Sequence, residues 1–201
     1  ILAAATAAHL QRVPIAHIAG GDVTEGSYDD AMRNCISCLA TVHFVTSSGA
    51  LDRLQRRGYS GVHLVGSPGV DYILHADWKR ERPIAEPYVV VSYQAETIDG
   101  TVDLDAVREA IAGRKTIWLT PNLDMGSERI PKGESYGHAE FLNLIYHCEE
   151  FIGNSSAILY EAPFFDPPVK CRMIGKRQQG RTIPMGDGHA SERIVKILKY
   201  T

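Results

Sequence analysis

The order of apolar and polar residues along the chain predicts short strands that alternate with helices. Each predicted strand is a short apolar run, and a polar loop and a stretch with helical spacing follow most of these runs. In the first part of the chain the predicted strands are 15–19, 42–46 and 62–67. The predicted helices there are 2–10, a helix that Ser27 caps and that runs through Leu39, and 50–57 after a Ser47-Ser48 cap. Strands that alternate with helices pair in parallel, so this part is predicted to form a parallel sheet.

A predicted turn at 67–71 and a charged segment with two prolines, 78–87, separate this part from a second one with the same alternation. The predicted strands of the second part are 88–93, 116–120, 150–152 and 169–174. Its predicted helices are 105–112, 138–148, one that begins at Ala157, and a last one at 190–198. We therefore predict an α/β protein with two parallel-sheet units and a domain junction at 78–87.

The composition is that of an ordinary globular protein, with 44% hydrophobic and 22% charged residues in a chain of 201. The 21 Lys and Arg residues and 24 Asp and Glu residues give a net charge of -3, which disfavours a nucleic acid partner. No apolar run reaches about 18 residues, so the sequence predicts no membrane span. The four cysteines fit a reducing cytoplasm, and Cys35 and Cys38 lie in a helical pattern that indicates packing rather than zinc or redox chemistry.

The strongest candidate for a ligand site is the corner Gly153-Asn154-Ser155-Ser156, between an apolar run and a helical one. Unpaired N–H groups at such a helix start, together with two hydroxyls, favour phosphate binding. Glu161 follows Ser155 by six positions, nearly two helical turns, and can accept hydrogen bonds from a sugar diol. Together these side chains suggest a nucleoside diphosphate site, but they also fit an ordinary helix cap.

A second candidate site is the loop 20–26, which follows the predicted strand 15–19. In an open α/β sheet, ligands gather at the carboxyl ends of the strands. Asp29 and Arg33 lie four positions apart on the next helix and therefore share a face. An exposed Asp–Arg pair at a helix start accounts for the same pattern without a function.

Five segments, in order, resemble the UDP-N-acetylglucosamine 2-epimerases, and most of all the hydrolysing branch that supplies sialic-acid and legionaminic-acid pathways. These segments are HIAGGDVTEG at 17–26, DDAMR at 29–33, GNSS at 153–156 with EAP at 161–163, RQQGR at 177–181, and GDGHAS at 186–191. The similarity spans nearly the whole chain.

The resemblance implies a GT-B-like fold of two Rossmann-like domains, in which the last helix packs back on the first domain. The implied parts are the remainder of the N-terminal domain at 1–77, a linker at 78–87, the UDP-binding domain at 88–185 and the C-terminal helix segment at 186–201. Family members begin well before the position of Ile1, with strands that carry a UDP-binding loop and a further Asp. We therefore expect the first domain to be incomplete, and we expect residues to be missing from the short segment between Arg181 and Pro184.

The implied reaction eliminates UDP across C1 and C2 of UDP-N-acetylglucosamine and hydrates the glycal to N-acetylmannosamine. One group removes the C2 proton, and another helps the diphosphate to leave. No metal or redox cofactor is needed. The resemblance also leads us to expect a homodimer, and a related diacetamido UDP-sugar is an alternative substrate.

The resemblance also assigns a role to each candidate residue. Asp29 is the catalytic carboxylate, Arg33 holds it and contacts the substrate, and Asp22 lies near the sugar. The expected substrate-binding residues are Ser155 and Ser156 for the diphosphate, Glu161 for the ribose hydroxyls, Arg177 for phosphate charge, Asn122 for nucleotide or sugar, and Gln94 for diphosphate and sugar. For Asp22, Arg177 and Asn122, a loop-turn Asp, a solvated basic loop and an Asn turn explain the residue equally simply.

Three residues depart from the family pattern. Ala19 stands where many members have a catalytic Glu, Gln94 where members usually have a His, and Asn34 where a His is common. A Gln donates a hydrogen bond but cannot act as an acid. Ala19 and Gln94 motivate a UDP-sugar binding protein without turnover as an alternative function. A non-hydrolysing epimerase is a second alternative, and a GT-B-like glycosyltransferase, which would share the UDP contacts but need an acceptor site, is a third.

Overall fold

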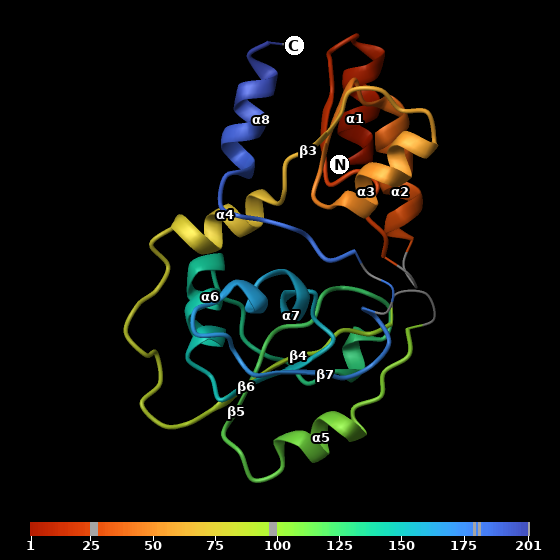
Figure 1. The fold of residues 1–201 in the computed structure, drawn as a ribbon. Helices are drawn as coiled ribbons and strands as arrows, with labels where there is room; N and C mark the ends of the chain where they lie inside the picture. The colour runs from red at the N-terminus through yellow and green to blue at the C-terminus, as the bar shows by residue number, and fades with distance from the viewer. Residues whose placement is uncertain (25–27, 97–99, 179, 181, 201) are drawn as a thin grey trace. The chain divides into compact units, whose positions relative to one another are not determined.

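The computed structural model describes residues 1–24, 28–96, 100–178, 180 and 182–200. The chain divides into two compact units, each with a parallel sheet of its own (Figure 1). Unit 1 comprises Ile1–Tyr72 and Gly180–Thr201, and unit 2 comprises Ile73–Gln179. The predicted α/β class with two parallel sheets is confirmed, and we describe each unit by itself.

Unit 1 is built on a three-stranded parallel sheet of order β1-β2-β3. Its strands are β1 (Ala16–Ile18), β2 (Val42–Val45) and β3 (Val62–Leu64). Its helices are α1 (Leu2–Leu10), α2 (Asp29–Leu39), α3 (Ser48–Arg56), α4 (Pro68–His75) and α8 (Ala190–Leu198). The sequence boundary between unit 1 and unit 2, after Tyr72, falls within α4. Ser47 caps α3 as predicted, because its Oγ accepts a hydrogen bond from the Ala50 N–H at 3.2 Å. The predicted Ser27 cap lies outside the described residues.

The sheet of unit 1 has an apolar core on both of its faces. Successive side chains of β2 point to opposite faces because side chains alternate along a strand. Val45 packs with Ala50 and Leu54 of α3 on one face. Phe44 packs with Ile194 of α8 on the other. A helix from the end of the chain therefore completes the core of unit 1.

The segment 67–71, predicted to be a turn, instead begins helix α4. Pro68 suits the first helical position because it has no N–H that needs a partner. The Asp71 carboxylate accepts hydrogen bonds from the N–H groups of the first two residues of α8, at 3.1 and 2.6 Å. The turn prediction was wrong because this stabilisation joins residues that lie 119 positions apart in the sequence.

Unit 2 contains a four-stranded parallel sheet of order β5-β4-β6-β7. Its strands are β4 (Val89–Ser92), β5 (Thr116–Trp118), β6 (Glu150–Gly153) and β7 (Cys171–Met173). Its helices are α5 (Asp105–Ile111), α6 (His138–Tyr146) and α7 (Ala157–Tyr160), with short 3-10 helices η1 (Ser127–Arg129) and η2 (Ala162–Phe164). The predicted strands and helices of this part are all present, with boundaries that differ by a few residues.

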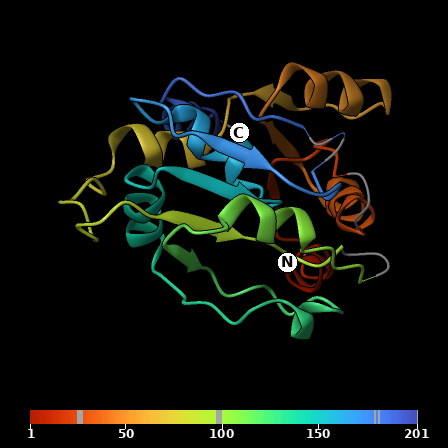
Figure 2. The same cartoon turned by 90° about the horizontal axis from the view of Figure 1, so that it is seen from below.

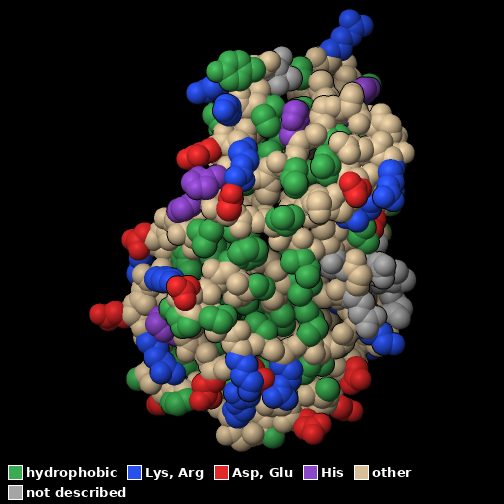
Figure 3. Space-filling view, viewed as in Figure 1, with side chains coloured by type: hydrophobic (Ala, Val, Ile, Leu, Met, Phe, Trp, Pro, Cys, Tyr) green, Lys and Arg blue, Asp and Glu red, His purple; other side chains and the backbone are tan. Residues whose placement is uncertain are grey.

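Helix α5 covers one face of this sheet, and α6 and α7 cover the other (Figures 1 and 2). Val91 of β4 packs with Val107 of α5, and its neighbour Val90 packs with Leu142 of α6. A parallel strand covered on both faces is expected to be apolar throughout, and β4 follows this rule. In the space-filling view, hydrophobic side chains gather on the visible face of unit 2, and acidic and basic side chains are interspersed around them (Figure 3).

A buried acidic residue, Glu150, lies at the start of β6. Its carboxylate is 1% exposed and lies 2.5 Å from Arg114 Nη1 and 2.9 Å from Arg172 Nε. Burial raises the pKa of Glu150, but the hydrogen bonds from the two arginines and the charge of Lys170 outweigh burial and leave the pKa below its ordinary value. This cluster ties β6 to β7 and to the segment before β5 at the amino edge of the sheet.

Two further sequence predictions concern membranes and cysteines. Within the described ranges, no helix is long and apolar enough to cross a membrane. Cys35 and Cys38 lie on α2, but both are exposed, so the predicted packing role is wrong. Their spacing indicates that they share a side of a helix, and it does not reveal which side faces the sheet.

Two histidines lie side by side in the sheet of unit 1. His17 of β1 is in register with His43 of β2, and their ring centroids are 6.4 Å apart. Burial, followed by the charges of His43 and Arg33, lowers the pKa of His17 to about 4. Burial also lowers the pKa of His43. Both imidazoles are therefore neutral in the folded protein at neutral pH.

We expect the protein to lose stability as the pH falls from about 6.5 toward 4. In this window the unfolded chain protonates His17 while the folded chain keeps it neutral, so added protons favour unfolding. The lowering of the pKa from 6.5 to about 4 corresponds to a contribution of at most about 3 kcal/mol from this side chain to the free energy of unfolding. Urea unfolding at a series of pH values measures the loss. His17→Gln should reduce the slope of stability against pH. His9 lies on the exposed side of α1, so His9→Gln should keep the wild-type slope. Equal slopes for the two variants would contradict the lowered pKa of His17.

Candidate functional site

The polar loops of unit 2 meet at the carboxyl edge of its sheet. In a parallel sheet every strand ends at the same edge, so the loops after the four strands lie together. Hydrogen bonds join residues from all four loops: Gln94 after β4, Asn122 after β5, Asn154 after β6 and Gln178 after β7. This edge contains most of the residues that the sequence singled out in its second half.

The corner after β6 is built around a glycine and a buried amide. Gly153 has a φ of 137°, and a Cβ there would lie 2.0 Å from the Ser92 carbonyl oxygen, so only glycine fits. The wholly buried Asn154 accepts a hydrogen bond from the Gln94 N–H at 2.7 Å and donates one to the Gln94 carbonyl at 2.8 Å. Gln178 Nε2 donates to the Asn154 carbonyl at 2.6 Å. The predicted strand–turn–helix corner is therefore present, and Asn154 holds it to the neighbouring loop.

The two serines of the corner are half-buried. Ser155 Oγ accepts a hydrogen bond from the Ala157 N–H at 3.3 Å, whereas Ser156, the N-cap residue of α7, has no side-chain cap hydrogen bond within the described part of the chain. Helix α7 has four residues, so its dipole is weaker than a long helix would provide. Glu161 directly follows α7 and is also half-buried. Hydroxyls and backbone N–H groups, rather than a helix dipole, are what this corner offers to an anion.

A carboxylate that sequence reasoning missed, Asp124, joins two of the predicted binding residues, Arg177 and Asn122. Arg177 Nη1 donates to Asp124 Oδ2 at 2.8 Å and to the Ala95 carbonyl. Asn122 Nδ2 donates to the same Asp124 oxygen at 2.7 Å, and the Asn122 N–H donates to Gln94 Oε1 at 2.7 Å. The Arg177 and Asp124 side chains are 19% and 18% exposed, so the pair is partly shielded from water. The one signal in the sequence was an acidic residue in a strand-end loop.

In unit 1 the loop after β1 passes close to its neighbours. Ala19 and Gly21 have φ values of 62° and 77°, in the left-handed region that favours glycine. A Cβ on Gly21 would lie 2.7 Å from the Ala50 carbonyl oxygen, and one on Gly20 would lie 3.0 Å from His17 Nδ1. Glycine is therefore required at position 21 and fits closely at position 20, and Asp22 follows the two glycines in the loop.

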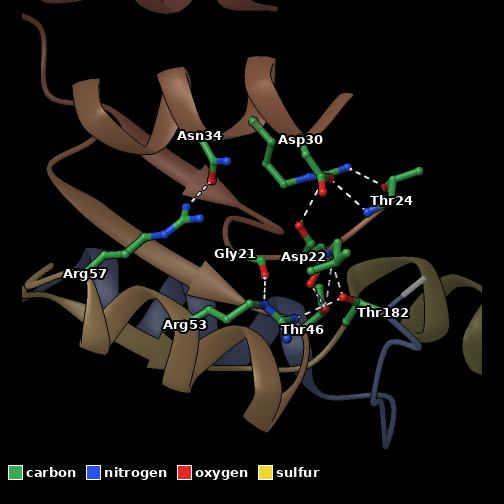
Figure 4. A network of polar contacts seen from close by, with 11 residues as sticks. Gly21, Asp22, Thr24, Asp30, Asn34, Thr46, Arg53, Arg57 and Thr182 are labelled. Atoms are coloured by element: carbon green, nitrogen blue, oxygen red, sulfur yellow. Dashed lines mark hydrogen bonds and ion pairs between the residues drawn. The ribbon is translucent and has the colours of Figure 1, made fainter. Parts of the chain in front are cut away.

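The Asp22 carboxylate is held by a hydroxyl from the neighbouring strand (Figure 4). Thr46, which follows β2, donates to the two carboxylate oxygens at 3.0 and 3.2 Å. Arg33 Nη1 donates to the Asp22 carbonyl at 3.0 Å. Sequence reasoning missed Thr46, although its place directly after a predicted strand was a signal that could have found it.

The ion pair of Arg33 is with Asp30, and not with Asp29 as the sequence predicted (Figure 4). Asp30 Oδ1 also accepts a hydrogen bond from the Thr24 N–H at 2.8 Å, and Arg33 Nη2 donates to the Thr24 hydroxyl at 3.2 Å. This loop contact draws the guanidinium toward Asp30. Asp29 is exposed and lines a cavity of about 890 Å³ in unit 1, together with Arg33 and His17.

Among the described residues, no group of three or more His, Cys, Asp or Glu side chains is placed to hold a metal ion.

Two α/β units, each with polar loops at the carboxyl edge of a parallel sheet, define a GT-B-like protein. The UDP-GlcNAc 2-epimerase of Methanocaldococcus jannaschii, solved in complex with UDP-GlcNAc and UDP, matches with a TM-score of 0.76 at 19% identity and covers 100% of this chain and 73% of that one. The UDP-GlcNAc 2-epimerase of Neisseria meningitidis, solved bound to UDP-GlcNAc, matches at 0.72 and 16% identity, with coverage of 100% and 73%. These matches confirm the predicted fold.

The family model of the UDP-N-acetylglucosamine 2-epimerases matches residues 1–184, so the chain belongs to this family. A UDP-N-acetylglucosamine 2-epimerase of Neisseria meningitidis serogroup B is 27% identical over 206 residues, which cover 90% of this chain and 54% of that protein. The UDP-N,N'-diacetylbacillosamine 2-epimerase (hydrolyzing) of Legionella pneumophila is 28% identical over 211 residues, which cover 90% and 55%. The chain thus spans about half the length of the curated relatives that it matches.

We expect Asn154→Ala to destabilise the protein by about 2–4 kcal/mol, because the partly buried N–H and carbonyl of Gln94 both lose their partner. Urea unfolding at neutral pH measures the change. Asn34→Ala is the matched control, since the Asn34 hydrogen bond is to an exposed arginine, Arg57. Its expected effect is within about 0.5 kcal/mol. Equal stabilities of the two variants would contradict the structural role of Asn154.

Proposed function

We propose that the protein is a hydrolysing UDP-N-acetylglucosamine 2-epimerase, which converts UDP-N-acetylglucosamine, or a diacetamido analogue, to free UDP and the corresponding 2-epimeric sugar. The observation that carries this proposal is the hydrogen-bonded edge of unit 2, where the serine corner, Asn122 and Arg177 are assembled from separate loops. The hydrolysing choice is supported by two relatives that are named hydrolysing diacetylbacillosamine 2-epimerases, at 24% and 28% identity.

In this proposal, unit 2 binds the nucleotide. Ser155 and Ser156 donate hydrogen bonds to the diphosphate, and Arg177 neutralises part of its charge. Glu161 accepts hydrogen bonds from the ribose hydroxyls. Asn122 and Gln94 contribute amide groups to nucleotide or sugar, and the amide of Gln94 still has donors although its oxygen accepts from Asn122.

The carboxylates of unit 1 act on the hexosamine in two steps. First, a base removes the C2 proton while the C1–O bond to UDP breaks, which leaves a C1–C2 double bond and UDP. Then water adds its hydroxyl to C1, and a proton returns to C2 from the opposite side, which inverts that centre. We assign the proton transfers to Asp29 and Asp22, and Arg33 stabilises negative charge beside them.

A UDP-sugar binding protein without turnover is the second candidate, because two positions lack groups that could transfer protons. Ala19, directly after β1, carries only a methyl group, and Gln94 carries a neutral amide. In this alternative the edge of unit 2 still binds the nucleotide. Turnover therefore separates the two candidates, whereas UDP binding does not.

We further propose that the whole protein works as a homodimer in the cytoplasm. The cysteines are free thiols in the structure, which fits a reducing compartment. Light scattering of the purified protein measures the oligomeric state.

The experiment that tests the proposed function is incubation with UDP-N-acetylglucosamine, and in parallel with a diacetamido UDP-sugar, in D₂O. We expect free UDP and a 2-epimeric sugar that carries deuterium at C2, read by NMR. A UDP-linked epimer would indicate the non-hydrolysing reaction, and UDP release only with an added acceptor would indicate a glycosyltransferase. Tight binding with no product would favour the binding protein.

We expect Asp29→Asn to lower the rate of UDP release by about 10²–10⁴-fold, because the amide cannot exchange a proton with C2. The affinity for UDP should stay within about twofold, since we assign UDP binding to unit 2. Asp52→Asn on α3 is the control and should leave the rate unchanged. Equal rates for wild type and Asp29→Asn would remove Asp29 from the mechanism.

We expect Arg177→Gln to weaken UDP binding by about 10–100-fold, because a charged hydrogen bond to phosphate is lost. Isothermal titration calorimetry with UDP measures this without turnover. Arg108→Gln is the matched control, since Arg108 forms an exposed ion pair with Asp105 on α5. An Arg177 variant with wild-type affinity would show that the diphosphate binds elsewhere.

A further inference from the structure

A segment from near the end of the chain pairs with the loop that carries Asp22 (Figure 4). The Val23 N–H donates to Thr182 Oγ1 at 2.7 Å, and the Thr182 N–H donates to the Val23 carbonyl at 3.0 Å. These partners lie 159 positions apart in the sequence. Further along, the Met185 N–H donates to the Thr46 carbonyl at 2.8 Å. The residue after Asp22, and the threonine that holds its carboxylate, are thus both bonded to this segment.

Arg53 of α3 holds the same loop from the other side (Figure 4). Its Nε donates to the Gly21 carbonyl at 2.6 Å, and its Nη2 donates to Thr182 Oγ1 at 3.0 Å. The hydroxyl of Thr182 therefore receives a hydrogen bond both from the loop and from Arg53. The residues on either side of Asp22 are each held by one member of this pair.

These contacts matter because they hold the backbone on both sides of Asp22. Gly21 has a φ of 77°, in the left-handed region that favours glycine. A carboxylate that transfers a proton must lie within hydrogen-bond reach of the reacting atom, and an error of about 1 Å costs on the order of 10²-fold in rate. Arg53 and Thr182 bond the backbone beside Asp22, so they act on its position and not on the reacting atoms.

We propose that Arg53 and Thr182 are positioning residues for Asp22, in which the Thr182 hydroxyl is the common acceptor that aligns the loop 21–23. This inference rests on the proposed function, since it assigns a role in the reaction of Asp22. It predicts that the segment that contains Thr182 is required for chemistry and not for nucleotide binding.

The test compares Thr182→Val, which is isosteric but removes the acceptor, with Thr182→Ser, which keeps it. We expect Thr182→Val to lower kcat by about 10–100-fold with KM within about twofold. Thr182→Ser should recover to within about threefold of wild type. Arg53→Ala should resemble Thr182→Val, and Arg53→Lys should be intermediate because it keeps the charge but loses the planar fork.

Arg57→Ala is the matched control, because Arg57 lies beside α3 and bonds Asn34 instead of the loop. It should keep wild-type kcat. The thermal midpoint of each variant is measured alongside, so that a loss of fold is seen directly.

A double-mutant cycle with Asp22→Asn separates positioning from a general structural role. If Thr182 acts through Asp22, Thr182→Val should cause no further loss of kcat in the Asp22→Asn background. Additive losses, or a Thr182→Val variant with wild-type kcat in an active enzyme, would overturn this inference alone. A wild-type protein without turnover would overturn the proposed function together with this inference.

Discussion

Parallel pairing of strands is the constraint on which both candidate sites depend. A parallel pair needs a crossover after each strand, so all strands of a sheet end at one edge. In unit 2 this brings together loops that follow β4, β5, β6 and β7, and in unit 1 it places Asp22 beside Thr46. Residues that are distant in sequence can therefore form one site without any of the segments encoding it alone.

In both units a planar side chain bonded to backbone groups shapes the loop at a strand end. Asn154 bonds the N–H and the carbonyl of Gln94, and Arg53 bonds the carbonyl of Gly21. An amide or guanidinium presents several polar atoms in one rigid plane, so it restrains two points at once. Backbone N–H and C=O groups in such tight loops lack the regular pairing of a strand, and these side chains provide them with hydrogen-bond partners. The groups that we assign to the substrate are thus placed by neighbours that we do not assign to it.

Two acidic residues of unit 2 show how position decides the role of a charge. Glu150 is 1% exposed at the amino edge, where arginines on neighbouring segments surround it. Such a buried cluster holds its strands together, and removal of one partner leaves an uncompensated charge. Asp124 is 18% exposed at the carboxyl edge and bonds Arg177 and Asn122 in loops. A partly exposed ion pair loses less interaction free energy than a buried one when its partners rearrange, which suits a place where an anionic ligand binds.

The sequence by itself determined the fold class and the corner after β6. Strand and helix periodicity is a local property of apolar spacing, and an apolar run, the residues Gly153-Asn154-Ser155-Ser156 and a helical run mark the corner within one short segment. The tertiary structure alone decided that Asp71 caps α8, that Arg33 pairs with Asp30, and which side chains hold the loop of Asp22. The reason is physical: spacing along a chain encodes which residues share a helix face or a strand face, but it does not encode the distance between loops that different strands bring to the same edge.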